Sequence, residues 1–288
     1  MSATADARTP RSVRSDTTFE IGRQRGIPNL GLHELWAARG VFGFLVWRDV
    51  KVRYAQTVLG IAWVVLQPLL TTVIFALFFG RLAHLPSDGV PYAAFALVGL
   101  ILWTFFSSAV SGAGNSMVEQ SSLLTKVYFP RLFVPLSPVA VSVLDATIAL
   151  AILAPAVLLK APPPRLSPVL LAPLFVLVAI VAAIGAGAAL SALNLRYRDF
   201  RYVIPFLLQG WMLASPVAYP ASMVPPAYRV LYAVNPLVGA LEGFRWALLG
   251  TAAPSGAVIG TSALSALAMF VAGVLYFRWS ERTLVDVA

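Results

Sequence analysis

The sequence predicts an all-α integral membrane protein with six transmembrane helices, an N-terminal amphipathic interface helix, and re-entrant half-helices between the fifth and sixth spans. Three observations predict this class. The chain contains six long apolar runs, apolar residues make up 59% and charged residues 11% of its 288 residues, and the mean hydropathy is +0.81. A soluble domain of this length needs more charged surface than that. We therefore expect a bilayer to surround most of the chain.

The N-terminal part is polar and then amphipathic. Residues 1–28 are Arg-rich and lack an apolar stretch, so we expect a flexible basic cytoplasmic tail and no cleavable signal peptide. Residues 29–53 are expected to form the interface helix, because Leu32–Trp47 spaces its apolar residues as a helix does but is short for a span. An ordinary juxtamembrane anchor is the alternative.

Residues 54–288 are expected to form the six-helix transmembrane domain. A spanning helix needs about 20 apolar residues, and each of the six runs is long enough. Arg131 and Asp145 are their only charged residues. The runs are Tyr54–Gly80, Gly89–Val118, Arg131–Leu159, Leu166–Leu195, Tyr202–Tyr228 and Trp246–Phe277.

The distribution of Lys and Arg predicts the orientation. Most of the 21 basic residues precede the first run or lie in the second and fourth connections and the C-terminal tail. Basic residues concentrate on the cytoplasmic side of membrane proteins, so both termini are expected in the cytoplasm. The basic residues that fall on the opposite side are Arg81, Lys160, Arg165, Arg229 and Arg245.

The fifth run is interrupted by prolines. Ser215–Leu237 holds five prolines, too many for one continuous helix, yet it stays nearly uncharged. They are Pro216, Pro220, Pro225, Pro226 and Pro236. This pattern predicts a helix that ends early, followed by re-entrant half-helices at the outer face. An apolar external loop resting on the lipid headgroups is the alternative.

Few residues could support catalysis or metal binding. The chain has two His and no Cys, so no His-clustered or thiolate metal site is expected, and no catalytic residue stands out. It lacks the G-x-x-x-x-G-K-[ST] motif, so it does not bind ATP through a P-loop. G-x-x-x-G occurs at Gly239–Gly243 and at Gly256–Gly260, and the second pair is the candidate helix-packing face.

Asp145 is the one ionisable residue deep within a run. An intramembrane carboxylate is a candidate pore or proton-relay group by default. A relay normally shows several such groups, so a structural hydrogen bond to a neighbouring helix is favoured, with Ser142 and Thr147 close in sequence.

Two runs combine aromatic rings with amide and hydroxyl groups. In the first run these residues recur at steps of four, four, four and three, which favours one helical face. Such a mixture suits a sugar chain, because rings stack on its CH faces and polar groups bond its hydroxyls; a lipid-facing aromatic stripe is the alternative. The candidates are Trp63, Gln67, Thr71, Phe75 and Phe78, with Tyr202, Phe206, Gln209 and Tyr219 in the fifth run.

Five blocks of sequence resemble the permease subunits of ABC transporters that export bacterial polysaccharides such as O-antigen of lipopolysaccharide, capsule and teichoic acid. They follow the family's order from Leu32 to Phe277. The blocks are RYAQTVLGIAWVVLQPLL (Arg53–Leu70), LLTKVYFPRLFVPLSP (Leu123–Pro138), SALNLRYRDFRYVIPFLLQ (Ser191–Gln209), SPVAYP (Ser215–Pro220) and NPLVGALEGFRWALLG (Asn235–Gly250).

The resemblance implies a transport subunit, not an enzyme, in the bacterial cytoplasmic (inner) membrane. A homodimer would enclose a channel for a lipid-linked polysaccharide, and two separate P-loop ATPase subunits would bind ATP and Mg, so this chain needs no cofactor and no nucleic acid. The aromatic candidates above would line the channel. The implied outer gate holds Pro216, Tyr219, Pro220, Pro225 and Pro226, and the implied ATPase-coupling residues are Leu123, Thr125, Lys126, Tyr128, Phe129 and Arg198.

Two other functions remain open. An ABC permease for drugs or small lipids would share the fold but should lack an aromatic channel. A membrane enzyme acting on lipid-linked sugars would need clustered acids or His at one membrane face, and only Glu242 with Arg245 comes near.

Overall fold

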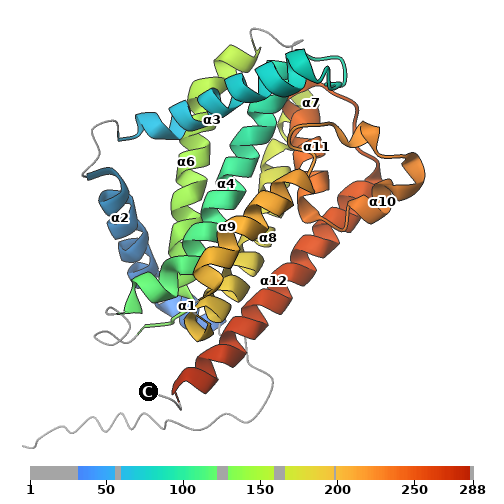
Figure 1. The fold of residues 1–288 in the computed structure, drawn as a ribbon. Coiled ribbons are helices and arrows are strands. Elements are labelled where there is room, and N and C mark those ends of the chain that lie inside the picture. The colour runs from blue at the N-terminus through green and yellow to red at the C-terminus, as the bar shows by residue number, and fades with distance from the viewer. Residues whose placement is uncertain (1–31, 56–59, 122–128, 159–165, 198, 286–288) are drawn as a thin grey trace, which may run out of the picture.

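The structure is a computed structural model that describes residues 32–55, 60–121, 129–158, 166–197 and 199–285. Every regular element among these residues is a helix, as the sequence predicts. Figure 1 shows a bundle of long helices, with several shorter helices at its upper right and another at its lower end.

The centre of the bundle is α4 (Tyr92–Glu119), which packs against α6 (Phe133–Leu158) and α8 (Ala172–Arg196). Most of α4 is buried because helices cover it on several sides. The last helix, α12 (Gly256–Val285), packs along α8 and leads down to the C-terminal end of the chain (Figure 1).

Small residues let α8 approach its neighbours closely. A Cβ atom added to Gly273 of α12 would lie 2.0 Å from the carbonyl oxygen of Gly185 in α8. On another face of α8, a Cβ at Gly187 would lie 2.6 Å from the Cβ of Ala113 in α4. Helices in membranes gain their contact mainly from such close packing, since lipid offers no hydrophobic drive between them.

Five helical segments of the described chain are long and apolar enough to cross a membrane. They match five of the six predicted runs, in order, but with different bounds. They are Ala62–Leu82, Tyr92–Glu119, Phe133–Leu153, Ala172–Arg196 and Gly256–Glu281.

The first of these segments starts later than expected. Tyr54, at the start of the first run, belongs to α2 (Arg39–Ala55), and α3 (Ala62–Phe75) begins beyond it. The wider π-helical segment η1 (Ala76–Leu82) continues α3. Together they cross one end of the bundle steeply relative to α4 and α6 (Figure 1).

The fifth run does not form one long helix. Its helix, α9 (Phe200–Leu213), has 14 residues, about 21 Å, which is less than the thickness of a hydrocarbon core. It ends partway along the bundle (Figure 1), so the prediction of an early end is correct. The short elements η2 (Ala221–Met223), η3 (Pro226–Tyr228) and α10 (Arg229–Tyr232) follow.

The sixth run was predicted as one helix from Trp246, and this is wrong. Trp246 lies in α11 (Pro236–Leu249), which ends at Gly250 with a left-handed φ of 69°. Glycine adopts this conformation without the cost that a Cβ brings, and it is a common way to end a helix. Pro254 lies in the connection, and α12 starts at Gly256.

The N-terminal helix is present and ends two residues later than predicted. It is divided into α1 (Leu32–Ala37) and α2, which continues past residue 53 to Ala55. Trp36, Phe44 and Trp47 are exposed on its outer side. Its position at a membrane interface stays a prediction.

Within this chain, the first of the two G-x-x-x-G motifs packs closely, whereas the second, the candidate packing face, does not. Gly256 and Gly260 face open space, whereas a Cβ at Gly239 would meet Ser262 at 2.7 Å and one at Gly243 would meet the ring of Phe175 at 2.1 Å. The G-x-x-x-G motif that packs within the chain therefore lies on α11. The remaining short helix, α7 (Leu166–Val169), precedes α8 and contacts α11.

Candidate functional site

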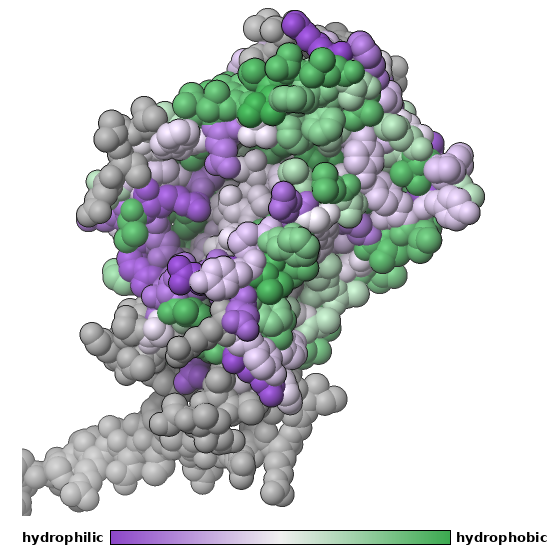
Figure 2. All heavy atoms as spheres, in the orientation of Figure 1, coloured by the Kyte–Doolittle hydropathy of each residue, from purple (hydrophilic) through white to green (hydrophobic). Residues whose placement is uncertain are grey.

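A polar hollow opens where α2, α3, α4 and α6 meet. It has a volume of about 190 Å³, and all four helices contribute to its walls. Figure 2 shows hydrophilic residues gathered in a hollow of this face, below the apolar surface at the top of the molecule. The polar residues of the walls are Arg53, Tyr54, Gln67, Thr104, Ser108, Ser142 and Asp145. Polar groups inside a membrane bundle normally face a cavity or another helix.

Asp145 connects α6 to α2 at the edge of this hollow. Its two carboxylate oxygens accept hydrogen bonds from the guanidinium of Arg53 and the hydroxyl of Tyr54. The carboxylate therefore has the interhelical partners that a structural role requires. Ser142 and Thr147 do not contribute, because their hydroxyls donate to Pro138 O and Val143 O of their own helix.

A second set of polar contacts fixes α2 about one helical turn before Arg53. Ser137 Oγ of α6 donates to Asp49 Oδ2 at 2.6 Å, and Asp49 Oδ1 pairs with Arg48. Arg48 Nη2 also donates to Gln120 Oε1 at 2.7 Å, just beyond the end of α4. These contacts hold α2 alongside α6 at two levels.

The predicted stripe on the first span divides between two environments. Trp63 (49% exposed) and Gln67 line the hollow, and Phe78 is exposed at 54%. Thr71 is half-buried and donates to Gln67 O. Phe75, by contrast, is 9% exposed and packs against Phe79 in the core, so its ring is not on the surface that Trp63 and Gln67 share.

The geometry of the helix explains this division. Each residue advances the helix by about 100°, so every step of four overshoots a full turn by about 40°. From Trp63 to Phe75 three such steps accumulate to roughly a third of a turn. The spacing therefore predicts neighbours one step apart but not a common face along the whole stripe.

The candidates on α9 form an exposed surface. Tyr202, Phe206 and Gln209 are exposed, whereas Ile204 and Leu208 are buried. Both α3 and α9 pack against α4. The channel-lining role of the exposed residues stays a prediction.

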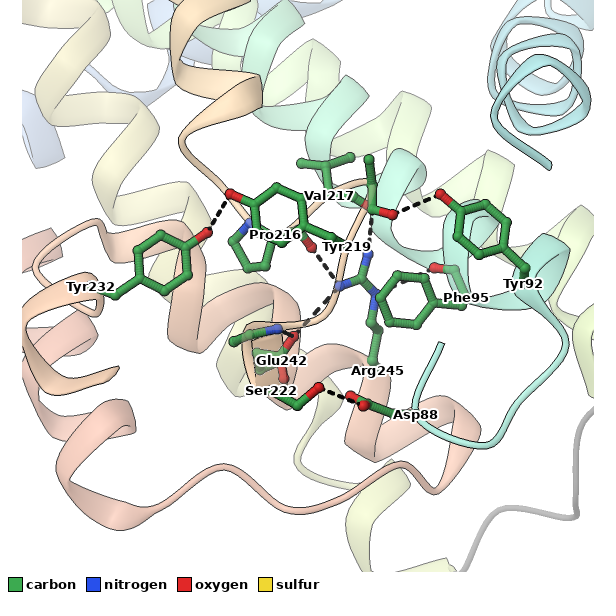
Figure 3. A network of polar contacts seen from close by, with 12 residues as sticks. Asp88, Tyr92, Phe95, Pro216, Val217, Tyr219, Ser222, Tyr232, Glu242 and Arg245 are labelled. Atoms are coloured by element: carbon green, nitrogen blue, oxygen red, sulfur yellow. Dashed lines mark hydrogen bonds and ion pairs between the residues drawn. The ribbon is translucent and has the colours of Figure 1, made fainter. Parts of the chain in front are cut away.

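A buried arginine holds the segment that follows α9 (Figure 3). Arg245 of α11 is 1% exposed, and its guanidinium donates to the carbonyl oxygens of Pro216 and Val217 and, from α4, of Phe95. The guanidinium carbon lies 3.6 Å from the centre of the Phe95 ring, a cation–π distance. We call the side chains of Arg245, Phe95 and Glu242, with the backbone that they hold, the arginine clasp.

Glu242 completes the arginine clasp. Its Oε1 lies 3.6 Å from Arg245 Nη1 and accepts a hydrogen bond from Ala221 N at 3.2 Å. Burial raises the pKa of Glu242, and the positive charge of Arg245 opposes that rise. Removal from water is costly for both groups, and the pairing and hydrogen bonds offset that cost.

Gly99 provides the room for the guanidinium. A Cβ on Gly99 of α4 would lie 2.2 Å from Arg245 Nη2 and 3.3 Å from Val217 O. A larger residue at this position would require the guanidinium to shift, and its hydrogen bonds to Pro216 O and Val217 O oppose that shift.

Asn235 ties the other end of the same segment. Its side-chain oxygen accepts from Leu237 N, which caps α11, and from Trp211 Nε1 of α9. Its amide nitrogen donates to Ala214 O and to Ser215 Oγ. One side chain thereby joins the end of α9 to the start of α11.

The predicted gate residues lie in and beside this held segment. Pro216 and Pro220 are buried, whereas Pro225 and Pro226 are exposed. Tyr219 donates to Leu213 O and its hydroxyl lies 3.0 Å from that of Tyr232. Burial is the main cause that raises the pKa of the Tyr232 phenol, and the hydrogen bond with Tyr219 raises it further.

Sequence reasoning missed Arg245, Asn235 and Gly99 as determinants of this region. The available signal was Arg245 itself, a lone cation in an apolar helix one turn after Glu242. A charge in such a place needs partners. The partners are backbone carbonyls, which no sequence pattern marks.

The predicted ATPase-coupling residues mostly lie outside the described residues: Leu123, Thr125, Lys126, Tyr128 and Arg198. Phe129 is described and is buried in an apolar cluster with Leu45 of α2 and Phe133 of α6. Its ring therefore packs inside the protein. Within the described part of the chain, no group of three His, Cys, Asp or Glu residues could hold a metal ion.

Comparisons with known proteins agree on one class. Residues 40–249 match the family model described as "ABC-2 type transporter". The chain is 30% identical to an O-antigen export system permease protein of Myxococcus xanthus over 74% of this chain and 82% of that one. It is 26% identical to an O-antigen export system permease protein of Klebsiella pneumoniae (69% and 76%) and 23% identical to a polysialic acid transport protein of Escherichia coli (83% and 92%).

Proposed function

Since this chain belongs to the ABC-2 type transporter family, we propose that it is the channel-forming permease half of an ATP-driven exporter. The exporter moves a lipid-linked polysaccharide across the bacterial cytoplasmic membrane. Two copies form the channel, and two P-loop ATPase subunits bind ATP and Mg and supply the energy. Both termini lie in the cytoplasm, in keeping with the basic residues.

The polar hollow is the observation that carries the proposal. Gln67, Thr104 and Ser108 offer hydrogen-bonding groups to it, and Trp63 offers a ring. A saccharide needs both kinds of contact, because its hydroxyls must replace the hydrogen bonds they made to water and its CH faces stack on aromatic surface. A purely apolar cargo would leave these polar groups unpaired.

The alternatives have less support. For a membrane enzyme the sequence offers Glu242 with Arg245, and in the structure both side chains hold backbone of the arginine clasp. A permease for drugs or small lipids would share the family, yet the relatives named above carry the names of O-antigen and polysialic acid transport.

Deleting the gene in its native host tests the proposal. Lipid-linked glycan should accumulate inside the cell and disappear from the surface, and the wild-type chain should restore export. Gln67→Arg should fail to restore it, because a long cation would project into the hollow, whereas Gln67→Asn should restore most of it. Normal surface glycan in the deletion strain would overturn the proposal.

A further inference from the structure

A second cavity, of about 450 Å³, lies beside the arginine clasp on the side of the molecule that the basic residues predict to be external. We call it the outer pocket. Its volume falls within the roughly 300–1,000 Å³ of sites that hold small organic ligands. Its walls come from four separate segments: Asp88, the Ala221–Tyr232 region, α11, and the connection into α12. The lining residues used below are Asp88, Ser222, Arg229, Tyr232, Glu242 and Ala253.

Three charged side chains converge on the outer pocket without using all their hydrogen-bonding atoms. Asp88 accepts from Ser222 Oγ through Oδ1 at 2.7 Å, and Glu242 accepts from Ala221 N through Oε1. Arg229 donates through Nε to Val224 O and through Nη2 to Ser222 O. In the contacts among described residues, Asp88 Oδ2, Glu242 Oε2 and Arg229 Nη1 are left over for a ligand.

The balance of charge indicates what kind of ligand fits. Two carboxylates, Asp88 and Glu242, face two guanidiniums, those of Arg229 in the wall and of Arg245 directly behind Glu242. The charges cancel, so the pocket offers little net attraction to a metal cation or to a phosphate. It does offer strong acceptors and a strong donor close together, beside the phenol of Tyr232. A neutral molecule with several hydroxyl groups makes use of all of them.

We propose that the outer pocket binds a saccharide unit of the exported glycan as it leaves the channel. The inference rests on the proposed function, since it takes the cargo to be a glycan. Hydroxyls of the sugar donate to Asp88 and Glu242, and Arg229 donates to a sugar oxygen. The pocket shares the Ala221–Tyr232 wall with the segment held by the arginine clasp, so a unit bound there lies beside the predicted gate.

Cysteine protection tests the outer pocket directly, because the chain has no cysteine of its own. Ala253→Cys places a thiol in the pocket wall, and Ala227→Cys places one on the exposed η3 nearby but outside the lining. Both variants are expressed in native-host cells that make the glycan and in matched cells whose glycan synthesis is blocked. A membrane-impermeant maleimide is added, and surface glycan is measured in parallel.

The expected result is that Ala253→Cys reacts severalfold more slowly in cells that make the glycan, while Ala227→Cys reacts equally in both. Adding Asp88→Asn should return the Ala253→Cys rate toward that of the glycan-free cells, since a carboxylate acceptor for the sugar is lost. Equal Ala253→Cys rates in both cells, with normal surface glycan, would overturn the outer pocket and leave the transport function standing. Equal protection of Ala253→Cys and Ala227→Cys in the cells that make the glycan, or protection of Ala253→Cys that Asp88→Asn leaves unchanged, would also overturn it.

Discussion

At the scale of single residues, Arg245 shows what a buried cation can do for backbone that no helix satisfies. The backbone carbonyls of Pro216 and Val217, beyond the end of α9, each need a hydrogen-bond donor. The guanidinium of Arg245 supplies an N–H group to each of them. Lysine cannot reproduce this geometry, because its ammonium is a single compact centre. The sequence indicated that the segment would leave a helix, through its prolines, but not which residue would hold it.

Gly99→Ala should destabilise the permease through the arginine clasp. The new Cβ would lie 2.2 Å from Arg245 Nη2, and such overpacking costs about 1–3 kcal/mol. Thermal unfolding of the purified protein, followed by fluorescence, measures the effect. Gly260→Ala is the matched control, since nothing lies within 4 Å of that position. Equal transition temperatures for both variants would contradict the arrangement around Gly99.

At the scale of elements, the attachment of α2 to α6 is the least expected feature. The sequence predicted this helix and gave Asp145 a structural partner on another helix. It could not identify Arg53 and Tyr54 as those partners, because they are 92 and 91 residues away in sequence. Helical periodicity is local, whereas the choice of neighbour depends on how the whole bundle packs.

Removing both acids should loosen α2. Leu45, in the middle of α2, is buried against Phe129 and Phe133, so Leu45→Cys should resist a thiol reagent in the otherwise unchanged chain. In a chain that also carries Asp49→Ala and Asp145→Ala, it should react severalfold faster. Phe44→Cys, exposed on the same helix, should react alike in both backgrounds. An unreactive Leu45→Cys in the triple variant would mean that apolar packing alone holds the helix.

The hollow on α3 makes a second prediction at this scale. Gln67→Cys should react with a water-soluble thiol reagent, because Gln67 lines the polar hollow. Thr72→Cys should not react, since Thr72 is buried, and neither should Val73→Cys, whose side chain is exposed on an apolar part of α3 that lipid would cover. If Val73→Cys reacts and Gln67→Cys does not, the water-filled side of α3 is the opposite face of the helix.

At the scale of the whole molecule, hydropathy predicted where most spans lie but not how each one ends. The second and third runs agree with α4 and α6 within three residues at each end, and the fourth agrees with α8 at its end but begins with the separate helix α7. The prediction of one helix from Trp246 was wrong because the sequence stays apolar on both sides of Gly250. The left-handed backbone conformation of Gly250 ends α11 there. Average hydropathy does not report such a turn.

The orientation of the whole chain can be tested with reporter fusions. A fusion at Ser87 should report an external location and one at Ser121 a cytoplasmic one, because basic residues concentrate on the side of Ser121. The matched fusions at Pro163 (external) and Arg198 (cytoplasmic) lie outside the described residues. A cytoplasmic signal from Ser87 would reverse the topology.

The short length of α9 has a consequence for what can disturb the region beyond it. Where a helix crosses the full bilayer, its own backbone satisfies every carbonyl, and no cargo can compete for them. Beyond Leu213, the carbonyls of Pro216 and Val217 instead depend on one side chain of another helix. If the segment shifts away from Arg245, these oxygens need replacement donors. Water and other hydroxyl groups can provide them, whereas an acyl chain cannot, so a shift of this segment costs less in hydrated surroundings than in hydrocarbon.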